Sequence, residues 1–245
     1  MLLDVDLEFT AKDADKAVKR GDLIIVIDVL RSSTTIINAL DNGVKSIIPT
    51  KSLKEAYKLH RQYPDYLLVG ERRGRKPRGF DFGNSPLEFK SKEICGRNMI
   101  ITTTSGTATL TRCRDAEWVL IGTFLNSKVI ADRAFEIAES KRVNVSFVLA
   151  GEKGRFSLED FICAGAIGAN FLKSKVSFSD KTLAAVLAFE QTKNNLHESI
   201  MKTQHAKHLT KLGFKNDVEF ACQLNVSTII PAYKAGKTKQ LISST

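Results

Sequence analysis

Four short segments of this chain contain most of the residues that could bind or transfer an anionic group. They span residues 28–35, 70–86, 102–107 and 150–160, and each follows or overlaps an apolar run typical of a buried strand. Ligands in open α/β sheets bind beyond the carboxyl ends of the strands. We therefore expect these segments to meet at one edge of one sheet and to form the functional site.

The first segment places a carboxylate at the end of an apolar strand pattern and an arginine at the start of a helix. A buried carboxylate without a partner is costly, so Asp28 needs a cation such as Arg31 or a metal ion. The hydroxyl residues that open the helix would offer an anion their N–H groups and the positive end of the helix dipole. These residues are Ser32, Ser33, Thr34 and Thr35. Plain helix capping is an alternative for Ser32, but it leaves Asp28 unexplained.

The second segment is a long loop rich in glycine and arginine, with neither a helical nor a strand period. Long loops inside compact domains are uncommon and tend to be functional. Its glycines allow close approach of the backbone to a ligand, and its arginine forks can neutralise a phosphate and a second acid group. A flexible, solvated surface loop is the competing interpretation.

The third segment lies between a strand and a helix, where Ser105, Gly106 and Thr107 could form an anion-binding nest. It lacks the residue order of a P-loop, and a plain capped turn is the alternative. In the fourth segment, Asp160 lies three residues after Ser157, as in a capping box, so capping alone could account for it. Its acidic residues are also hard oxygen donors of the kind that Mg²⁺ binds.

Short β-branched apolar runs alternate with amphipathic helical stretches along the chain. This alternation predicts the α/β class, as a three-layer α/β/α fold whose sheet is largely parallel or mixed. Strands are expected over residues 23–30, 44–49, 66–70, 99–104, 118–122, 143–150 and 227–232. Helices are expected over residues 32–42, 53–62, 107–114, 128–139, 158–172, 180–193, 200–212 and 218–223. A single domain over 1–245 is expected, with two similar sub-lobes as an alternative and a polar, frayed tail over 236–245.

The composition is that of an ordinary globular protein, with 43% hydrophobic and 26% charged residues. The four cysteines occur singly, which argues against a zinc ribbon and a disulfide framework. No apolar run approaches the roughly 20 residues of a membrane span, and the acidic start of the chain does not resemble a signal peptide. We therefore expect a cytoplasmic protein without a membrane partner.

The formal net charge of +10 has two interpretations, a solvated lysine-rich surface or a surface that binds nucleic acid. Nucleic-acid surfaces usually interleave basic residues with aromatics, whereas the dense basic run over residues 72–78 contains no aromatic residue. A small anionic phosphorylated substrate suits this run better, and no nucleic-acid partner is expected. The oligomeric state is left open, with a homodimer as one option.

Several segments resemble motifs of the 2-phosphosulfolactate phosphatase family. They read VIDVLRSSTT (26–35), GERRGRKPRGFDFGNSP (70–86), TTTSGTATL (102–110) and AGEKGRFSLEDFICAGAI (150–167), and the similarity continues through HLTKLGFKNDVEFACQLNVSTIIP (208–231). The GFDFGNSP and SLED stretches, in that order, are the most specific part. The resemblance covers nearly the whole chain.

The resemblance implies an α/β/α fold and a Mg²⁺-dependent phosphatase that releases phosphate from 2-phosphosulfolactate to give sulfolactate, a step of coenzyme M biosynthesis. Two stretches depart from the family pattern. The chain has Thr104-Ser105-Gly106-Thr107 where members typically read T-T-N-G-T, and His205-Ala206-Lys207 where they tend to show H-G-[RK]. Both departures put the exact substrate in question more than the type of reaction.

The resulting hypothesis assigns catalysis to Asp28, Arg31 and Asp160. The carboxylates expected to hold Mg²⁺ are Asp28, Glu71, Glu159 and Asp160. The phosphate would lie against Arg31, the helix start at Ser32, Ser33 and Thr34, and the turn of Ser105, Gly106 and Thr107. The carboxylate and the sulfonate of the substrate would be held by Arg72, Arg75, Arg78, Asn84 and Ser85.

Two chemical routes and two other functions stay open. Hydrolysis could use a metal-bound water or a covalent aspartyl-phosphate on Asp28. The other functions are a Mg²⁺-dependent phosphatase of another small 2-phospho carboxylic acid, and a non-enzymatic protein that binds phosphorylated ligands or RNA. The histidines show no informative pattern, and solvated or capping roles are expected for them.

Overall fold

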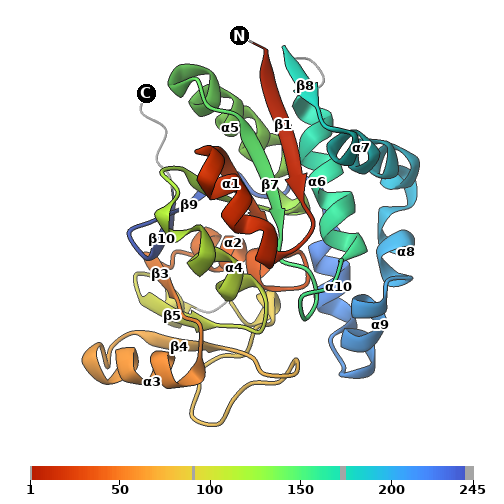
Figure 1. Ribbon diagram of the computed structural model, residues 1–245. Coiled ribbons are helices and arrows are strands. Elements are labelled where there is room, and N and C mark those ends of the chain that lie inside the picture. Colours follow the sequence, from red (N-terminus) through yellow and green to blue (C-terminus); the bar gives the residue numbers. More distant parts are fainter. Residues whose placement is uncertain (1, 90–91, 172–174, 241–245) are drawn as a thin grey trace.

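The structure is a computed structural model that describes residues 2–89, 92–171 and 175–240. Within this part of the chain, ten strands form one mixed sheet with helices packed against it (Figure 1). The strand β2 (Leu23–Ile27) shows the layering directly. Its odd-numbered residues pack in one hydrophobic cluster and its even-numbered residues in another, because successive side chains of a strand point to opposite faces. The predicted three-layer α/β/α class is confirmed.

The central part of the chain contains one pattern twice: strand, helix, strand, helix, strand and then a tight turn at or just after a Gly-Glu pair. The first copy comprises β2, α2 (Ser32–Asp41), β3 (Ser46–Pro49), α3 (Leu53–Gln62) and β4 (Leu67–Gly70). The second copy comprises β5 (Asn98–Thr102), α4 (Gly106–Arg112), β6 (Val119–Gly122), α5 (Ser127–Lys141) and β7 (Val145–Leu149). We call these two units the first and the second repeat.

The two repeats exchange strands. The order of the sheet is β4-β5-β3-β10-β9-β6-β2-β7-β1-β8. Consequently β5 of the second repeat lies between β3 and β4 of the first, and β2 of the first repeat lies between β6 and β7 of the second. All four of these pairings are parallel. Each repeat therefore needs a strand of the other to complete its hydrogen-bonded sheet.

A hairpin of β9 (Pro231–Lys234) and β10 (Lys237–Gln240) joins the two halves of the sheet. β10 pairs antiparallel with β3, β9 pairs antiparallel with β6, and the two hairpin strands are antiparallel to each other. The parallel groups on either side therefore run in opposite directions. In Figure 1 the arrow of β1 points down toward the half that contains β3, β4 and β5. The carboxyl ends of the two groups can thus face each other.

The last strand corrects one sequence prediction. The sequence predicts a frayed polar tail over residues 236–245, but residues 237–240 form β10. The polar composition is misleading because exposed lysines alternate with a fully buried residue, Thr238, which pairs with a strand on each side. Residues 241–245 lie outside the described part of the chain.

The remaining elements extend the sheet and cover its faces. The helices and strands outside the repeats and the hairpin are β1 (Leu3–Glu8), α1 (Ala14–Arg20), α6 (Leu158–Phe171), β8 (Val176–Phe178), α7 (Asp180–Thr192), α8 (Leu196–Met201), α9 (Gln204–Lys211) and α10 (Lys215–Ala221). Short 3₁₀ helices are η1 (Ala11–Asp13), η2 (Pro86–Glu88), η3 (Lys92–Ile94), η4 (Cys113–Asp115), η5 (Phe124–Asn126) and η6 (Lys193–Asn195). A search of the described helices finds none with the length and apolarity that a bilayer crossing requires.

One predicted helix is two helices in the structure. The sequence predicts a single helix over residues 200–212, whereas α8 ends before Thr203 and α9 begins after it. Thr203 has an extended backbone, and its hydroxyl accepts a hydrogen bond from the N–H of Ala206 at 3.2 Å, so it is the N-cap of α9. The helix predicted over 158–172 ends at Phe171 among the described residues, and residue 172 lies outside them.

The four cysteines should differ sharply in reactivity. Cys95 is exposed, whereas Cys113, Cys163 and Cys222 are buried. Burial raises the pKa of Cys113 and of Cys222 to about 12 and raises the pKa of Cys163 as well, which suppresses the reactive thiolate. We expect Ellman's reagent at pH 8 to modify one cysteine in the native protein, to modify none in Cys95→Ser, and to modify all four in denaturant. Rapid reaction of a second native thiol would contradict this placement.

Candidate functional site

A cavity of about 280 Å³ lies where the segments that follow β2, β4, β5 and β7 meet. Each repeat contributes two of these strands. The polar side chains on the cavity wall include Asp28, Arg31, Glu71, Arg73, Asn84, Ser105, Glu152, Lys153, His205 and His208. All four segments singled out in the sequence therefore converge, although they come from two oppositely directed groups of strands rather than from one edge of a parallel sheet.

Asp28 is the carboxylate at the end of β2 and is only 6% exposed on the cavity wall. Its Oδ1 accepts a hydrogen bond from the N–H of Ser32 at 3.3 Å. Burial raises the pKa of Asp28 to about 6; the negative charges of Glu71 and Glu159 act in the same direction, while His205 and the Ser32 N–H oppose them. A cation bound in the cavity would therefore be favoured by this poorly solvated carboxylate.

The hydroxyl residues at the start of α2 are engaged within the fold. Ser33 Oγ accepts a hydrogen bond from the N–H of Asp28 at 3.1 Å, and Thr34 Oγ1 donates to the carbonyl of Val29 at 2.7 Å. Ser32, Ser33 and Thr34 are each at most 2% exposed. These predicted phosphate binders thus hold the turn that carries Asp28, and their side chains do not line the cavity.

Arg31 is 3% exposed and is fixed from several sides. Its Nη1 donates to Asp217 Oδ2 at 2.7 Å, and its Nη2 donates to the carbonyl of Gly74 at 3.0 Å. The guanidinium also lies 4.1 Å from the centre of the Phe214 ring. Ser85 Oγ donates to the other oxygen of Asp217 at 2.6 Å, so Ser85 supports Arg31 indirectly. Asp217 escapes sequence reasoning because it lies 186 residues from Arg31 along the chain.

Glu71 uses both of its carboxylate oxygens on neighbouring loops. Oε1 accepts hydrogen bonds from the N–H and the hydroxyl of Thr104, each at 2.7 Å. Oε2 accepts from the N–H of Gly74 at 2.7 Å. Glu71 therefore ties the turn after β4 to the end of β5, across the boundary between the repeats.

Asp160 has the matching role on the other side of the site. Its Oδ1 accepts from the N–H of Val29 at 2.8 Å and its Oδ2 from the N–H of Gly151 at 3.2 Å. Burial, followed by the charges of Asp28 and Glu159, raises the pKa of Asp160 well above its usual value. Asp160 does not line the cavity, so its contacts hold the β2–α2 turn against the segment after β7.

His205 is a cavity residue for which the sequence predicted no function. Its Nδ1 lies 3.1 Å from Glu159 Oε1. Burial opposes the charge of both groups, but their contact lowers the pKa of Glu159 and raises that of His205. The two residues are 46 positions apart on α6 and α9, so no local spacing could reveal the pair.

The four carboxylates predicted as Mg²⁺ ligands do not form a cage. Glu71 and Asp160 have both oxygens hydrogen-bonded, and Glu159 is paired with His205. No cluster of three or more His, Cys, Asp or Glu side chains among the described residues could hold a metal ion. Mg²⁺ usually binds one or two carboxylates and fills its other positions with water and phosphate. The donor set therefore fits Mg²⁺ bound mainly through Asp28, and it does not fit a metal that needs a full set of protein ligands.

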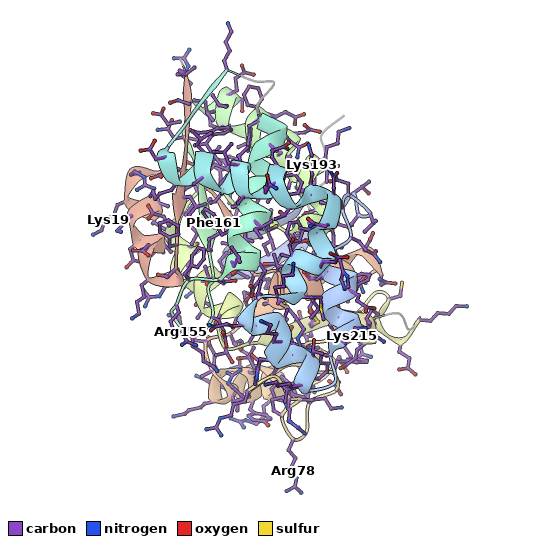
Figure 2. All side chains as sticks on the ribbon, turned by 90° about the vertical axis from the view of Figure 1, so that its right-hand side faces the viewer. Lys19, Arg78, Arg155, Phe161, Lys193 and Lys215 are labelled. Atoms are coloured by element: carbon purple, nitrogen blue, oxygen red, sulfur yellow. The ribbon has the colours of Figure 1, made fainter. Side chains whose placement is uncertain are left out.

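The loop after β4 brings Arg73 to the cavity, and not the arginines predicted from the sequence. Arg72 is tied to β5, where its Nη2 donates to Thr102 Oγ1 at 2.8 Å. Arg75 and Arg78 are exposed and do not line the cavity, and Figure 2 shows Arg78 projecting away from the body of the protein. Arg73 is exposed too, so what distinguishes it from the other arginines of this run is its place on the cavity wall.

Two predicted polar binders do border the cavity, Asn84 and Ser105. Asn84 is 5% exposed, and its Oδ1 lacks a hydrogen-bond partner within the described residues. An unpaired buried amide oxygen is costly, so Asn84 Oδ1 fits a hydrogen-bond donor supplied by a bound ligand or its water. Thr107 is fully buried and bonds to the backbone of the preceding turn, so it does not reach the cavity.

Gly106 allows the two repeats to approach closely beside Asp28. A Cβ at this position would overlap Asp28 Oδ2 and would lie 2.7 Å from Ser32 Oγ. We expect Gly106→Ala to lower kcat/KM about tenfold or more by displacing Asp28, in a steady-state assay of the activity that the sequence motifs imply. The control is Gly79→Ala, where φ is 77° and an added Cβ meets no heavy atom within 4 Å. It should lose roughly 1 kcal/mol of stability and keep its activity; equal activity losses in both variants would contradict the close approach.

Comparison with known proteins decides the family. The profile described as 2-phosphosulpholactate phosphatase matches residues 9–236. The chain belongs to this family. A Thermotoga maritima protein named "Probable 2-phosphosulfolactate phosphatase" is 39% identical over 212 residues, which cover 86% of this chain and 89% of the relative. A Clostridium tetani protein of the same name is 34% identical over 239 residues, covering 97% of this chain and 100% of the relative.

Membership in the 2-phosphosulpholactate phosphatase family confirms the resemblance of the sequence motifs, and it places the chain among the phosphoric monoester hydrolases. Both stretches that depart from the family pattern border the cavity, through Ser105 and His205. They are therefore positions where this member of the family could differ from others in what it binds.

Proposed function

We propose that the protein is a Mg²⁺-dependent phosphatase that hydrolyses 2-phosphosulfolactate to sulfolactate and phosphate, in coenzyme M biosynthesis. The family match and the names of the relatives support the reaction and the substrate. The observation that carries the proposal is a desolvated carboxylate, Asp28, on the wall of a cavity that Arg31, Arg73, Lys153 and His205 also line. Phosphoryl transfer depends mostly on positioning and charge neutralisation, which this arrangement can provide.

Asp28 and Arg31 would be the centre of the reaction. When bound, Mg²⁺ would neutralise charge on the phosphoryl oxygens and polarise phosphorus, with Asp28 as its carboxylate ligand. Arg31 is held rigidly by Asp217, so its remaining N–H donors can orient the phosphoryl group at little entropic cost. The Oδ1 of Asn84, which has no hydrogen-bond partner among the described residues, can accept a hydrogen bond from a water molecule in the site.

Hydrolysis breaks the bond between phosphorus and the ester oxygen, and the departing oxygen needs a proton. His205 borders the cavity, and its Nδ1 is hydrogen-bonded to Glu159. The other ring nitrogen, Nε2, is therefore available to donate that proton. The attacking oxygen comes from water, either directly or after a phosphoryl group has passed to Asp28. Label in Asp28 after a single turnover in ¹⁸O-labelled water would require the covalent route with attack at the acyl carbon. Acid quench of a single turnover with ³²P-labelled substrate separates the two routes in general, because only the covalent route leaves ³²P on Asp28.

The test is phosphate release from racemic 2-phosphosulfolactate and from 2-phospholactate, each with Mg²⁺ and with EDTA. We expect turnover only with Mg²⁺ and a preference for the sulfonate. If the protein preferred 2-phospholactate or phosphoglycerate, the proposed reaction type would stand, but the substrate would be another 2-phospho acid. Absence of turnover with every phospho-acid would contradict the enzyme and favour a protein that only binds phosphorylated ligands.

A further inference from the structure

Two tight turns in the site have the same backbone structure. In residues 72–75 the N–H of Arg72 donates to the carbonyl of Arg75 at 2.9 Å, and the reverse bond is 3.2 Å. In residues 152–155 the two corresponding bonds are both 3.0 Å. These turns follow β4 and β7, which occupy equivalent positions in the first and the second repeat. The repeats therefore present the same hairpin to one cavity from two sides.

The first central residue of each turn is a long cation in a left-handed conformation. Arg73 has φ 54° and Lys153 has φ 52°, and each is followed by a glycine with positive φ. Such turns favour Asn, Asp or Gly at this position, and another residue costs roughly 1 kcal/mol there. Strained residues of this kind concentrate at functional sites, so the cost points to a role for the two side chains.

Both cations line the cavity, whereas other basic residues of the same loops do not. All four side chains are exposed, but only Arg73 and Lys153 line the cavity, whereas Lys76 and Arg155 do not. Arg31, the other cavity arginine, is already neutralised by Asp217. Lys153 Nζ lies 3.5 Å from Glu152 Oε1, but the lysine side chain is 59% exposed, and exposed pairs of this kind are weak enough for an anionic ligand to compete. The charges available to a ligand thus lie mainly on the two turns.

The turns are also fixed to the reaction centre. The carbonyl of Gly74 accepts a hydrogen bond from Arg31, and its N–H donates to Glu71. On the other side, the N–H of Lys153 donates to Ser105 Oγ at 3.4 Å. The backbones that carry Arg73 and Lys153 are thus tied to Arg31 and to Ser105, so the two cations can bind two anionic groups that flank the phosphoryl group.

We propose that Arg73 and Lys153 are a pair of specificity-determining residues that bind the two substrate anions that are not transferred. Arg73 binds the carboxylate, because its planar fork matches two carboxylate oxygens, and Lys153 binds the sulfonate as a point charge. This inference rests on the proposed function. It explains how a small cavity selects a substrate with three acidic groups.

Three substrates test the pair: 2-phosphosulfolactate, 2-phospholactate, which lacks the sulfonate, and isopropyl phosphate, which lacks both flanking anions. Lys153→Ala should lower kcat/KM for 2-phosphosulfolactate about 10- to 100-fold and leave the other two nearly unchanged. Arg73→Ala should lower kcat/KM by a similar factor for 2-phosphosulfolactate and 2-phospholactate, which both contain the carboxylate. It should leave kcat/KM for isopropyl phosphate nearly unchanged. Arg73→Lys and Lys153→Arg should each recover part of the loss.

The matched controls are Lys76→Ala and Arg155→Ala, which remove a neighbouring exposed cation from each loop and should leave all three values unchanged. An equal loss with all three substrates would overturn the inference, because it would place Arg73 or Lys153 on the phosphoryl group or in the fold. The inference would also be overturned if Arg73→Ala impaired only 2-phosphosulfolactate while Lys153→Ala impaired both substrates that contain a carboxylate.

A binding measurement separates failure of the inference from failure of the proposed function. Calorimetric titration with sulfolactate and with lactate needs no turnover. We expect sulfolactate to bind the wild type at least tenfold more tightly than lactate, and Lys153→Ala to remove this difference. A wild type that binds sulfolactate in this way without hydrolysing its phosphate ester would overturn the proposed function alone. A wild type that turns over 2-phosphosulfolactate while the variants keep its selectivity would overturn the inference alone.

Discussion

Replacement of Asp28 by Asn should reduce phosphate release by about 10³-fold or more, because it removes the carboxylate that either binds the metal ion or attacks phosphorus. The amide has nearly the same shape and can still accept the hydrogen bond from the N–H of Ser32. The measurement is kcat/KM with 2-phosphosulfolactate at saturating Mg²⁺. Activity within tenfold of the wild type would contradict the assignment of Asp28 to the reaction centre.

The same variant should be more stable than the wild type in EDTA. The pKa of Asp28 is raised from 3.8 to about 6 in the folded protein, chiefly by burial, so its ionisation destabilises the fold. This penalty is complete above the folded pKa and disappears as the pH falls through it toward the unfolded value. Asp28→Asn should therefore melt at a higher temperature than the wild type at pH 7.5, and the difference should vanish near pH 4. A variant that is less stable than the wild type at pH 7.5 would contradict the cost of burying the ionised carboxylate.

The second large effect concerns stability. Asp217→Ala leaves the guanidinium of Arg31 buried without its ion-pair partner, and loss of one member of a buried pair costs roughly 3–5 kcal/mol. It also removes the acceptor of the hydrogen bond from Ser85. We expect the free energy of unfolding, measured in urea, to fall by about this amount, and kcat to fall because Arg31 loses its orientation.

An exposed ion pair on the same helix provides the control. Lys215 and Glu219 are 3.2 Å apart at i and i+4, and both are exposed. Glu219→Ala should cost no more than about 0.5 kcal/mol. The double variant Arg31→Met/Asp217→Leu should recover much of the stability lost in Asp217→Ala, but not its activity. Similar costs for Asp217→Ala and Glu219→Ala would contradict the burial of the Arg31 pair.

The fold class was predictable because the central strands are buried on both faces and read as continuous apolar runs, as in residues 23–27. Elements without such a signal were missed or misplaced. β1 alternates Leu3, Val5 and Leu7 with acidic residues over six positions, which is too short to stand out. The strand predicted over 227–232 begins only at Pro231, because its pairing depends on the hairpin and not on local propensity.

The site was predictable at the level of segments and not of side chains. The strand ends identify which stretches reach the cavity, but the direction of each side chain follows from turns and distant contacts. In the loop after β4, the turn over 72–75 selects Arg73 from a run of basic residues. Asp217 and His205 meet their partners only through tertiary packing. The available signal for Lys153 was that a Gly-Glu pair is followed within a few residues by a Gly-Arg pair in both loops, with one residue more between the pairs in the first loop.

The exchange of strands between the repeats also governs how the chain can fold during synthesis. β2 ends at Ile27, but its neighbours β6 and β7 end only at Gly122 and Leu149. At roughly 5–20 residues per second, β2 waits on the order of ten seconds on the ribosome before both neighbours have been made. The hairpin that links the halves is made last of all. The apolar strand β2 therefore lacks at least one of its neighbours for about half of the synthesis of the chain, and the sheet is joined only when the hairpin has been made. Folding of this protein is thus completed late and depends on protection from aggregation.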